Sequence, residues 1–515
     1  MRPTPEGIEA CIALLEAFVE NRAELAEVSL EQRNRLLTAA GRLSRPERNE
    51  QRLLARALLK KRRRELRAAD EAQLERTGIR RKRLEPVLTT PDPDPLALSE
   101  ASGGEFDRAA SSSVELPEPP RLNKERVCYV CKVPCVQLHF FYDQMCRACG
   151  DFNYQKRTQT ADLNGRVAFI SGARVKIGYQ AAILLLRAGA RVIVTTRFPH
   201  DAALRYARES DFEKWRERLE IYGLDLRHTP SIEVFAQHLC QSYERLDFVL
   251  HNACQTVRRP SGFYAHLMRA ELESSHNLPE NARSLLAPYE AMRAQTTLLV
   301  QPAGQGSGAP LAVGLHAAPA LSQVALAQED LAAGAHIFPT GELDADLQQV
   351  DLRTVNSWRL ELDQVGTVEL LEVHLVNAIA PFVLNARLKS IMLRERTFDK
   401  HIVNVSAMEG QFYRRFKTDK HPHTNMAKAA LNMMTRTSAA DYARDGIFMN
   451  SVDTGWVTDE DPVHIAARKT AENGFHPPLD VVDGAARIVD PIFNGINSGR
   501  HVWGQFLKDY RPTAW

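Results

Sequence analysis

Four cysteines between residues 128 and 149 have the type and spacing of metal ligands. They form two Cys-x2-Cys pairs, Cys128 with Cys131 and Cys146 with Cys149, and 14 residues separate the pairs. Each pair can present two thiolates from one tight turn, and four thiolates suit tetrahedral Zn²⁺. Such a closed site leaves no position for water, so we expect a structural zinc or one that serves docking. A redox dithiol or unrelated free cysteines are the alternatives.

Three neighbouring residues bear on the same module, which we place at residues 121–160. Cys135 and His139 are possible substitute ligands, and Gly150 permits the backbone twist of a zinc knuckle. A module of about 35 residues cannot bury enough apolar surface to fold unaided. Metal binding would therefore explain how the module folds.

A second chemical pattern is a glycine-containing turn at residues 171–178. The run VAFIS before it predicts a buried strand, and the run IGYQAAILLLRAGA after it predicts a helix. Gly172 and Gly178 lie where the backbone must approach a pyrophosphate closely. The helix that begins near Ile177 directs its N-terminus at that anion. The spacing predicts a dinucleotide-binding turn.

The elements that hold this turn alternate between strand and helix from Leu163 onwards. The expected strands are 166–171, 191–196, 219–226, 246–253, 401–406 and 447–452. The expected helices are 177–188, 200–219 and 231–243, followed by helices from about residues 366 and 424. This alternation predicts an α/β fold with a Rossmann-like, doubly wound parallel sheet. It stops after Arg259, so we interpret residues 260–350 as an insertion that is partly disordered.

Two regions precede the module and the sheet. Residues 1–85 carry apolar side chains at three- and four-residue steps, broken at Gly41 and Pro46, which predicts two helices in a hairpin. The basic run Lys60–Arg64 suits a solvated helix face better than a nucleic-acid contact. Residues 86–120 are rich in Pro, Ser and acidic residues and predict a disordered linker.

Composition places the chain among globular proteins. Of its 515 residues, 44% are apolar and 25% are charged, with a formal net charge of +2. This balance gives no global field that would attract nucleic acid or an acidic membrane. The N-terminus lacks the pattern of a signal peptide, and no run of about 18 strongly apolar residues predicts a membrane span. We expect a soluble, cytoplasmic homo-oligomer that does not bind membranes.

Seven segments between Leu163 and the C-terminus resemble the short-chain dehydrogenase/reductase superfamily. They are SGARVKIG, LDLRH, LHNAC, VNAIAPFVL, IVNVSAMEG, TNMAKAALNMMTRTSA and IFMNSVDTGWV. The resemblance implies that residues 161–515 form an NAD(P)-dependent oxidoreductase domain. Its reaction would be hydride transfer on an unidentified carbonyl, alcohol or enone substrate. The resemblance covers neither the preceding regions nor the insertion.

The resemblance also implies cofactor-binding positions. Asp225 matches the carboxylate that accepts a bond from the adenine amine. Arg197 stands where the family often binds a 2′-phosphate, and Thr196 replaces the acid that would bind a ribose hydroxyl, which favours NADP over NAD. The implied set is Gly172, Arg174, Lys176, Ile177, Gly178, Arg197, Asp225, Leu226, Asn252, Ala253, Lys428 and Gly455. Lys176 replaces a glycine of the family's turn, and Thr454 replaces the proline before Gly455.

The family's catalytic positions match only in part. Asn377 and Lys428 match its asparagine and lysine, whereas Thr424 stands at its tyrosine. Ala407 stands at its working serine, and Ser406 lies one residue earlier. An aliphatic hydroxyl has a pKa several units above the value of about 10 for tyrosine, so Thr424 is a poor general acid. It can still orient a substrate oxygen by hydrogen bonding.

Proton transfer would then need a group on the loop before the helix of Lys428. Tyr413, His421 and His423 lie on this loop, and we select Tyr413 and His423 as candidate donors. Tyr413 and Lys417 have the Y-x3-K spacing, but the apolar helical pattern continues from Lys428 and not from Lys417. The alternative is a catalytically inactive NADP(H)-binding sensor or scaffold that uses the zinc module to dock a protein partner.

Overall fold

The computed structural model describes residues 4–91, 121–300, 312–331, 334, 336–413 and 417–515. Contacts divide the chain into two compact units, Met1–Ala72 and Gln73–Trp515. The first unit contains helices α1 (Pro5–Glu20) and α2 (Leu30–Ser44) and most of α3 (Arg48–Glu75). Neither α1 nor α2 has a buried residue. Residues 5–83 thus form four α-helices in place of the expected two, the fourth being α4 (Gly78–Arg83). Ser29 caps α2 by accepting the Gln32 amide, and the break predicted at Gly41 is wrong because Gly41 lies inside α2.

An eight-stranded sheet organises the second unit. The strand order is β10-β9-β8-β7-β6-β3-β4-β5, with every neighbouring pair parallel except β10 and β9. The strands are β3 (Val167–Ser171), β4 (Arg191–Thr196), β5 (Leu219–Gly223), β6 (Phe248–His251), β7 (Lys400–Ser406), β8 (Ile447–Asp453), β9 (Phe506–Lys508) and β10 (Arg511–Thr513). Every residue of β3, β5, β6 and β7 is buried, as expected for a parallel sheet covered on both faces. The predicted doubly wound fold is confirmed.

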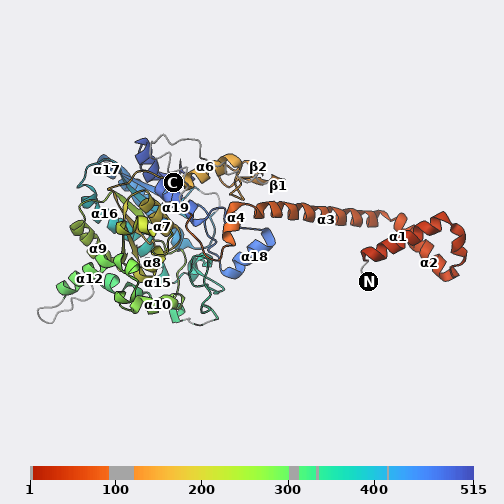
Figure 1. Ribbon diagram of the computed structural model, residues 1–515, viewed down its shortest axis with the longest axis horizontal. Coiled ribbons are helices and arrows are strands. Elements are labelled where there is room, and N and C mark those ends of the chain that lie inside the picture. The colour runs from red at the N-terminus through yellow and green to blue at the C-terminus, as the bar shows by residue number, and fades with distance from the viewer. Residues whose placement is uncertain (1–3, 92–120, 301–311, 332–333, 335, 414–416) are drawn as a thin grey trace. The chain divides into compact units, whose positions relative to one another are not determined.

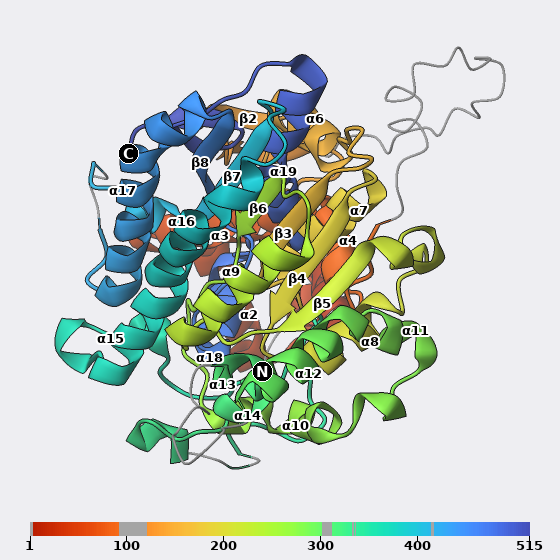
Figure 2. The same ribbon diagram turned by 90° about the vertical axis from the view of Figure 1, so that its left-hand side faces the viewer.

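Helices cover the two faces of this sheet. Helix α7 (Lys176–Arg187) packs against α19 (Val481–Ser498), and α9 (Thr229–Ser242) packs against α16 (Ala380–Met392). Figure 2 shows α9, α16 and α17 (Pro422–Arg444) in front of the strands.

The continuous helix Thr367–Met392 is long and apolar enough to cross a membrane by length and composition alone. It joins α15 (Thr367–His374) to α16 through a π-helical turn, Leu375–Ile379. Ala380, Leu384 and Leu388 on this helix belong to the main core cluster. The helix is therefore a core helix of the second unit.

The insertion covers the outer edge of the sheet. Its described residues form five α-helices, besides short 3-10 turns: α10 (Ala265–Leu272), α11 (Glu280–Ser284), α12 (Ala287–Val300), α13 (Val313–His316) and α14 (Ala318–Leu321). The Ile221 amide on edge strand β5 donates to the Leu285 carbonyl, and Tyr289 is buried against the same strand. Pairing removes an exposed strand edge. The described residues of the insertion thus pack on the sheet, while 301–311, 332–333 and 335 lie outside the described residues.

The cysteine-rich module lies beside the sheet and near α4 (Gly78–Arg83) (Figure 1). It contains the antiparallel strands β1 (Arg121–Val127) and β2 (Pro134–Gln137), followed by α6 (Arg147–Arg157). The start of the expected linker also packs on the second unit, because the Thr90 hydroxyl bonds both Glu209 and Gln180. The first residues of the expected linker therefore contact the second unit through Thr90. Residues 92–120 of the linker lie outside the described part of the chain.

Candidate active site and metal centre

A cavity of about 1240 Å³ opens at the carboxyl ends of the parallel strands. The residues that line it from the ends of β3, β4, β6, β7 and β8 include Gly172, Thr196, Asn252, Ser406 and Asp453. Successive strands diverge here, since β3 lies between β4 and β6 in the sheet. Ligands of open α/β sheets bind at such a switch point, outside the carboxyl ends of the strands.

The glycine turn is held by close backbone contacts at one end of this cavity. Gly172 has φ +69°, and a Cβ on Gly178 would lie 2.4 Å from the Gly172 carbonyl oxygen and 2.3 Å from Asn252 Nδ2. Asn252 Nδ2 donates to the Gly172 carbonyl at 2.8 Å. Lys176, at the family's middle glycine, keeps a left-handed backbone with φ +57°. The turn therefore retains a glycine-like backbone at Lys176, where α7 begins.

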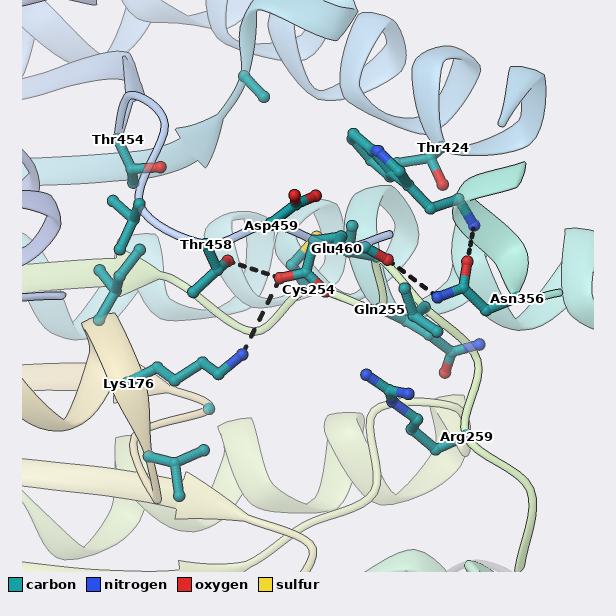
Figure 3. A pocket seen from close by; sticks show the side chains of 18 of the residues that line it. Lys176, Cys254, Gln255, Arg259, Asn356, Thr424, Thr454, Thr458, Asp459 and Glu460 are labelled. Carbon is teal, nitrogen blue, oxygen red and sulfur yellow. Dashed lines mark hydrogen bonds and ion pairs between the residues drawn. The ribbon is translucent and has the colours of Figure 1, made fainter. Parts of the chain in front are cut away.

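An acidic side chain reaches this turn from the segment after β8 (Figure 3). Glu460 Oε1 lies 3.9 Å from Lys176 Nζ and accepts the Thr458 hydroxyl at 2.6 Å. Asn356 holds the backbone by donating to the Glu460 carbonyl at 2.9 Å. Burial acts to raise the pKa of Glu460, but Lys176 and Thr458 hold it below its ordinary value. An ionised carboxylate thus faces the turn that we expect to bind a pyrophosphate.

Two arginines line the same end of the cavity, and they have different partners. Arg174 Nη1 forms an ion pair at 2.6 Å with Asp201, a carboxylate that it shares with Arg205. Arg197 Nη2 donates to the Tyr264 hydroxyl at 2.7 Å, and its guanidinium lies 4.7 Å from the centroid of that ring. Tyr264 belongs to the insertion and lines the cavity as well. Arg197 is therefore the arginine better placed for a further anion.

Asp225 and Leu226 also line the cavity. Arg227 binds the Asp225 carboxylate through its backbone amide, Nε and Nη2, and it also bonds Glu372 at 3.0 Å. Burial would raise the pKa of Asp225, but these bonds with Arg227 lower it below the ordinary value. The carboxylate is therefore ionised and oriented by Arg227.

The opposite end of the cavity contains the hydroxyls and the lysine of the expected catalytic set. Lys428 on α17 donates from Nζ to the Val405 carbonyl at 2.7 Å. Thr424 lies one turn earlier on α17, and Ser406 ends β7. Both residues line the cavity, and their buried hydroxyl oxygens have no hydrogen-bond partner among the described residues. Both hydroxyls can therefore bind a polar atom of a ligand.

Asn377 does not line the cavity but bonds a residue that does. Its Oδ1 accepts the Gln255 amide at 2.8 Å, and Gln255 lines the cavity while Asn377 does not. Asn377 lies in the π-helical turn Leu375–Ile379, where the Ala380 amide bonds the Leu375 carbonyl. Such single turns are frequent at functional sites. The asparagine supports the wall through Gln255.

Neither of the two expected proton donors lines the cavity in the described part of the chain. The Tyr413 side chain is 54% exposed, and its hydroxyl lies 3.4 Å from Thr513 Oγ1. His423 is buried, with Nε2 3.2 Å from Glu369 Oε1. His423 lies within the first turn of α17, which begins at Pro422.

His421 lines the cavity instead. It precedes Pro422 with φ +44°, and its ring stacks on Trp358 at 3.8 Å between ring centroids, with planes 7° apart. Burial lowers the pKa of His421, while Glu409 acts to raise it. Pro422 is a sequence signal for the start of a helix. It could have indicated that His421 lies on the loop and His423 on the helix.

The four cysteines of the module converge on one point. Their four Sγ atoms lie within 4.8 Å of one another, and Cys131 and Cys146 Sγ are 3.8 Å apart. Metal–sulfur bonds of about 2.3 Å in a tetrahedron give sulfur–sulfur edges of about 3.8 Å. A Val133 backbone bond lowers the pKa of Cys131 to about 7, whereas burial raises the pKa of Cys146 and Cys149. A bound cation would hold all four as thiolates, so the set fits zinc.

Neither possible substitute ligand belongs to the four-sulfur cluster, and Cys135 Sγ instead donates to the Arg126 carbonyl at 3.5 Å. His139 Nδ1 accepts the amides of Phe141 and Tyr142, at 3.1 and 3.4 Å. Gly150 lies within α6, and a Cβ there would come within 2.3 Å of the His139 Cβ. The glycine is therefore needed for this close approach and not for the expected backbone twist.

Two family models match the sheet domain. Residues 166–282 match the model described as short chain dehydrogenase, and residues 361–476 match the model described as enoyl-(acyl carrier protein) reductase. The sheet domain thus matches the short-chain dehydrogenase/reductase superfamily of oxidoreductases over residues 166–282 and 361–476.

Individual relatives differ in how much of the chain they share. Uncharacterized protein R665 of Acanthamoeba polyphaga mimivirus is 29% identical over 401 residues, which cover 74% of each chain. Dehydrogenase/reductase SDR family member 13 of Bos taurus is 35% identical over 106 residues, 19% of this chain and 27% of that protein. Retinol dehydrogenase 11 of Mus musculus is 31% identical over 114 residues, 21% of this chain and 36% of that protein. The last two likenesses thus span about a quarter to a third of those proteins.

Proposed function

We propose that the chain is an NADP(H)-dependent oxidoreductase that acts on a carbonyl, an alcohol or an activated double bond. One observation carries this proposal. A phosphate-binding turn at one end and the Lys428–Thr424 helix at the other line a single cavity. When bound there, NADP(H) would supply or accept a hydride.

The nucleotide end would bind phosphates in two places. The N-terminus of α7 and the Lys176 ammonium suit the pyrophosphate, which must displace the Glu460 carboxylate from Lys176. Arg197, stacked on Tyr264, suits a 2′-phosphate through a charge-assisted bond. Lys428 would bind the ribose, and Thr424 and Ser406 would orient the substrate oxygen with their unpaired hydroxyls.

His421 would exchange the substrate proton in place of the family's tyrosine. In alcohol oxidation, the hydroxyl proton would pass to an imidazole nitrogen while the carbon loses its hydride to the nicotinamide. The lowered pKa of His421 keeps the ring neutral at pH 7, which is the form a general base requires. Carbonyl reduction would need the protonated ring and would therefore be favoured at lower pH.

A nucleotide sensor without catalysis is the second candidate. Thr424 stands at the tyrosine position, and Tyr413 and His423 lie outside the described cavity lining. These observations support binding without proton transfer, with the zinc module available to dock a partner.

A binding and turnover experiment separates the two candidates. NADPH and NADH fluorescence titrations should show binding with NADPH preferred, and a panel of alcohols and carbonyls should then change absorbance at the nicotinamide band. Turnover of any substrate supports the oxidoreductase, and binding without turnover supports the sensor. Absence of binding to either nucleotide contradicts both.

Metal analysis tests the zinc proposal separately. The purified chain should contain about one zinc, which Cys146→Ser should remove, whereas Cys240→Ser outside the cluster should not. A metal-free protein whose four thiols react freely would contradict it.

A further inference from the structure

The four-cysteine module contributes directly to the cavity wall. Tyr129, Lys132 and Gln144 from the module line the cavity. Tyr129 lies between the two cysteines of the first pair, so a metal at the cluster would fix the turn that carries it. Its hydroxyl accepts the backbone amide of Trp456 at 3.0 Å. A residue of the metal-binding turn thus bonds a segment more than three hundred residues away.

The bonded segment is the turn that follows β8. Gly455 has φ +75°, and a Cβ there would lie 2.5 Å from Leu479 Cδ1 and 3.1 Å from the Tyr129 hydroxyl oxygen. The Leu479 amide donates to the Trp456 carbonyl at 3.3 Å. The turn is therefore confined between Tyr129 and Leu479, and the Tyr129 hydroxyl sets its position.

The module holds the far end of the same segment as well. Gln144 Nε2 donates to the His476 carbonyl at 2.6 Å, and the Tyr142 hydroxyl donates to Asp483 at 2.5 Å. Leu479 is buried with Cys128, Tyr142 and Met145 in one apolar cluster. Residues 454–479 include α18 (Val463–Asn473) and many of the residues that line the cavity. Both ends of this cavity-lining segment are thus attached to the module.

We infer that the four-cysteine module positions the wall of the nucleotide cavity, with Tyr129 as the positioning residue that couples metal binding to nucleotide binding. The metal would hold the Cys128–Cys131 turn, the turn holds Tyr129, and Tyr129 holds the Trp456 amide. Coupling between two binding sites is reciprocal, so each ligand strengthens the binding of the other by the same factor. The inference rests on the proposed function for its two ligands, zinc and NADP(H).

Tyr129→Phe is the direct test, because it keeps the ring and removes only the hydrogen-bond acceptor. Amide hydrogen exchange in residues 454–479 should accelerate by about 2–10-fold, the effect of losing one net hydrogen bond. The Kd for NADPH should rise within the same range, while zinc content stays that of the parent and the midpoint of thermal unfolding falls by at most a few degrees, on the order expected for one hydrogen bond. Tyr154→Phe, in the same module but not in the cavity lining, is the matched control and should change none of these.

The reciprocal measurement uses the parent protein. Saturating NADPH should slow zinc release to a chelator, and Tyr129→Phe should reduce this protection. Unchanged exchange in residues 454–479 of Tyr129→Phe overturns the inference, as does unchanged NADPH affinity. If the parent binds no NADPH, the proposed function fails, and hydrogen exchange alone still decides whether Tyr129 holds the turn.

Discussion

The two ends of the cavity differ in what their function would depend on. At the nucleotide end, main-chain conformation provides most of the site: Gly172, Gly178 and the N-terminus of α7. At the opposite end, proton transfer depends on side chains of α17 and of the loop before it. A phenol of the family is replaced there by Thr424, and the titratable loop residues that enter the cavity lining are Glu409, Lys420 and His421.

This difference shows which kind of site tolerates substitution. Lys176 replaces a glycine, yet its φ of +57° preserves the turn, so backbone recognition of an anion can survive a change of side chain. A proton donor cannot survive in that way, because donation depends on a group with a suitable pKa at one place. Substitutions at the two ends should therefore have effects of different kinds and sizes.

Lys428→Ala should have the largest effect, because Lys428 is expected to serve both ends. We expect turnover to fall by at least about 10²-fold and NADPH to bind about 10-fold more weakly, since a buried charged donor is lost. Stopped-flow kinetics and fluorescence titration measure the two effects. Lys417→Ala, outside the cavity lining, is the control. Equal effects of Lys428→Ala and Lys417→Ala would show that Lys428 is not the functional lysine.

His421→Asn should affect the proton-transfer end alone, and asparagine tolerates the left-handed backbone at this position. We expect about 10²-fold slower alcohol oxidation with unchanged NADPH affinity. In the parent, oxidation should decline only as the pH falls through the lowered pKa of His421, and the variant should lose this acid limb. Tyr413→Phe is the control. If Tyr413→Phe slows alcohol oxidation and His421→Asn does not, Tyr413 and not His421 is the group that exchanges the proton.

Arg197→Ala should affect the nucleotide end alone. Loss of a charge-assisted phosphate contact should weaken NADPH binding by about 10–100-fold and leave NADH unchanged. Titration with both nucleotides gives the ratio of the Kd for NADH to the Kd for NADPH directly. Arg208→Ala, an exposed arginine outside the cavity, is the comparison. An unchanged ratio would mean that the NADP preference is wrong.

Lys176→Gly should have the smallest effect on binding, because the backbone of the turn is retained. We expect NADPH to bind less than about 10-fold more weakly, while release of the left-handed lysine raises the free energy of unfolding by about 1 kcal/mol. Chemical denaturation and titration measure the two quantities. A loss of binding as large as that of Arg197→Ala would show that side-chain charge, and not the backbone, dominates this end.

The sequence was sufficient for the parts of the molecule whose residues act close together along the chain. The alternation of strands and helices predicted the doubly wound sheet, since each period reflects burial on one local element. Two Cys-x2-Cys pairs within 22 residues predicted the cluster that brings four sulfur atoms within 4.8 Å. The glycine turn was equally local. In each case short spacing limits the geometry that the chain can adopt.

Only the tertiary structure decided which distant groups meet. His421 and His423 are two residues apart, yet one enters the cavity and the other bonds Glu369, because the loop turns into α17 at Pro422. Glu460 reaches Lys176, and Tyr129 reaches Trp456, across contacts that no spacing encodes. Such contacts depend on how whole elements pack, and packing is the sum of many weak interactions that no short sequence pattern specifies.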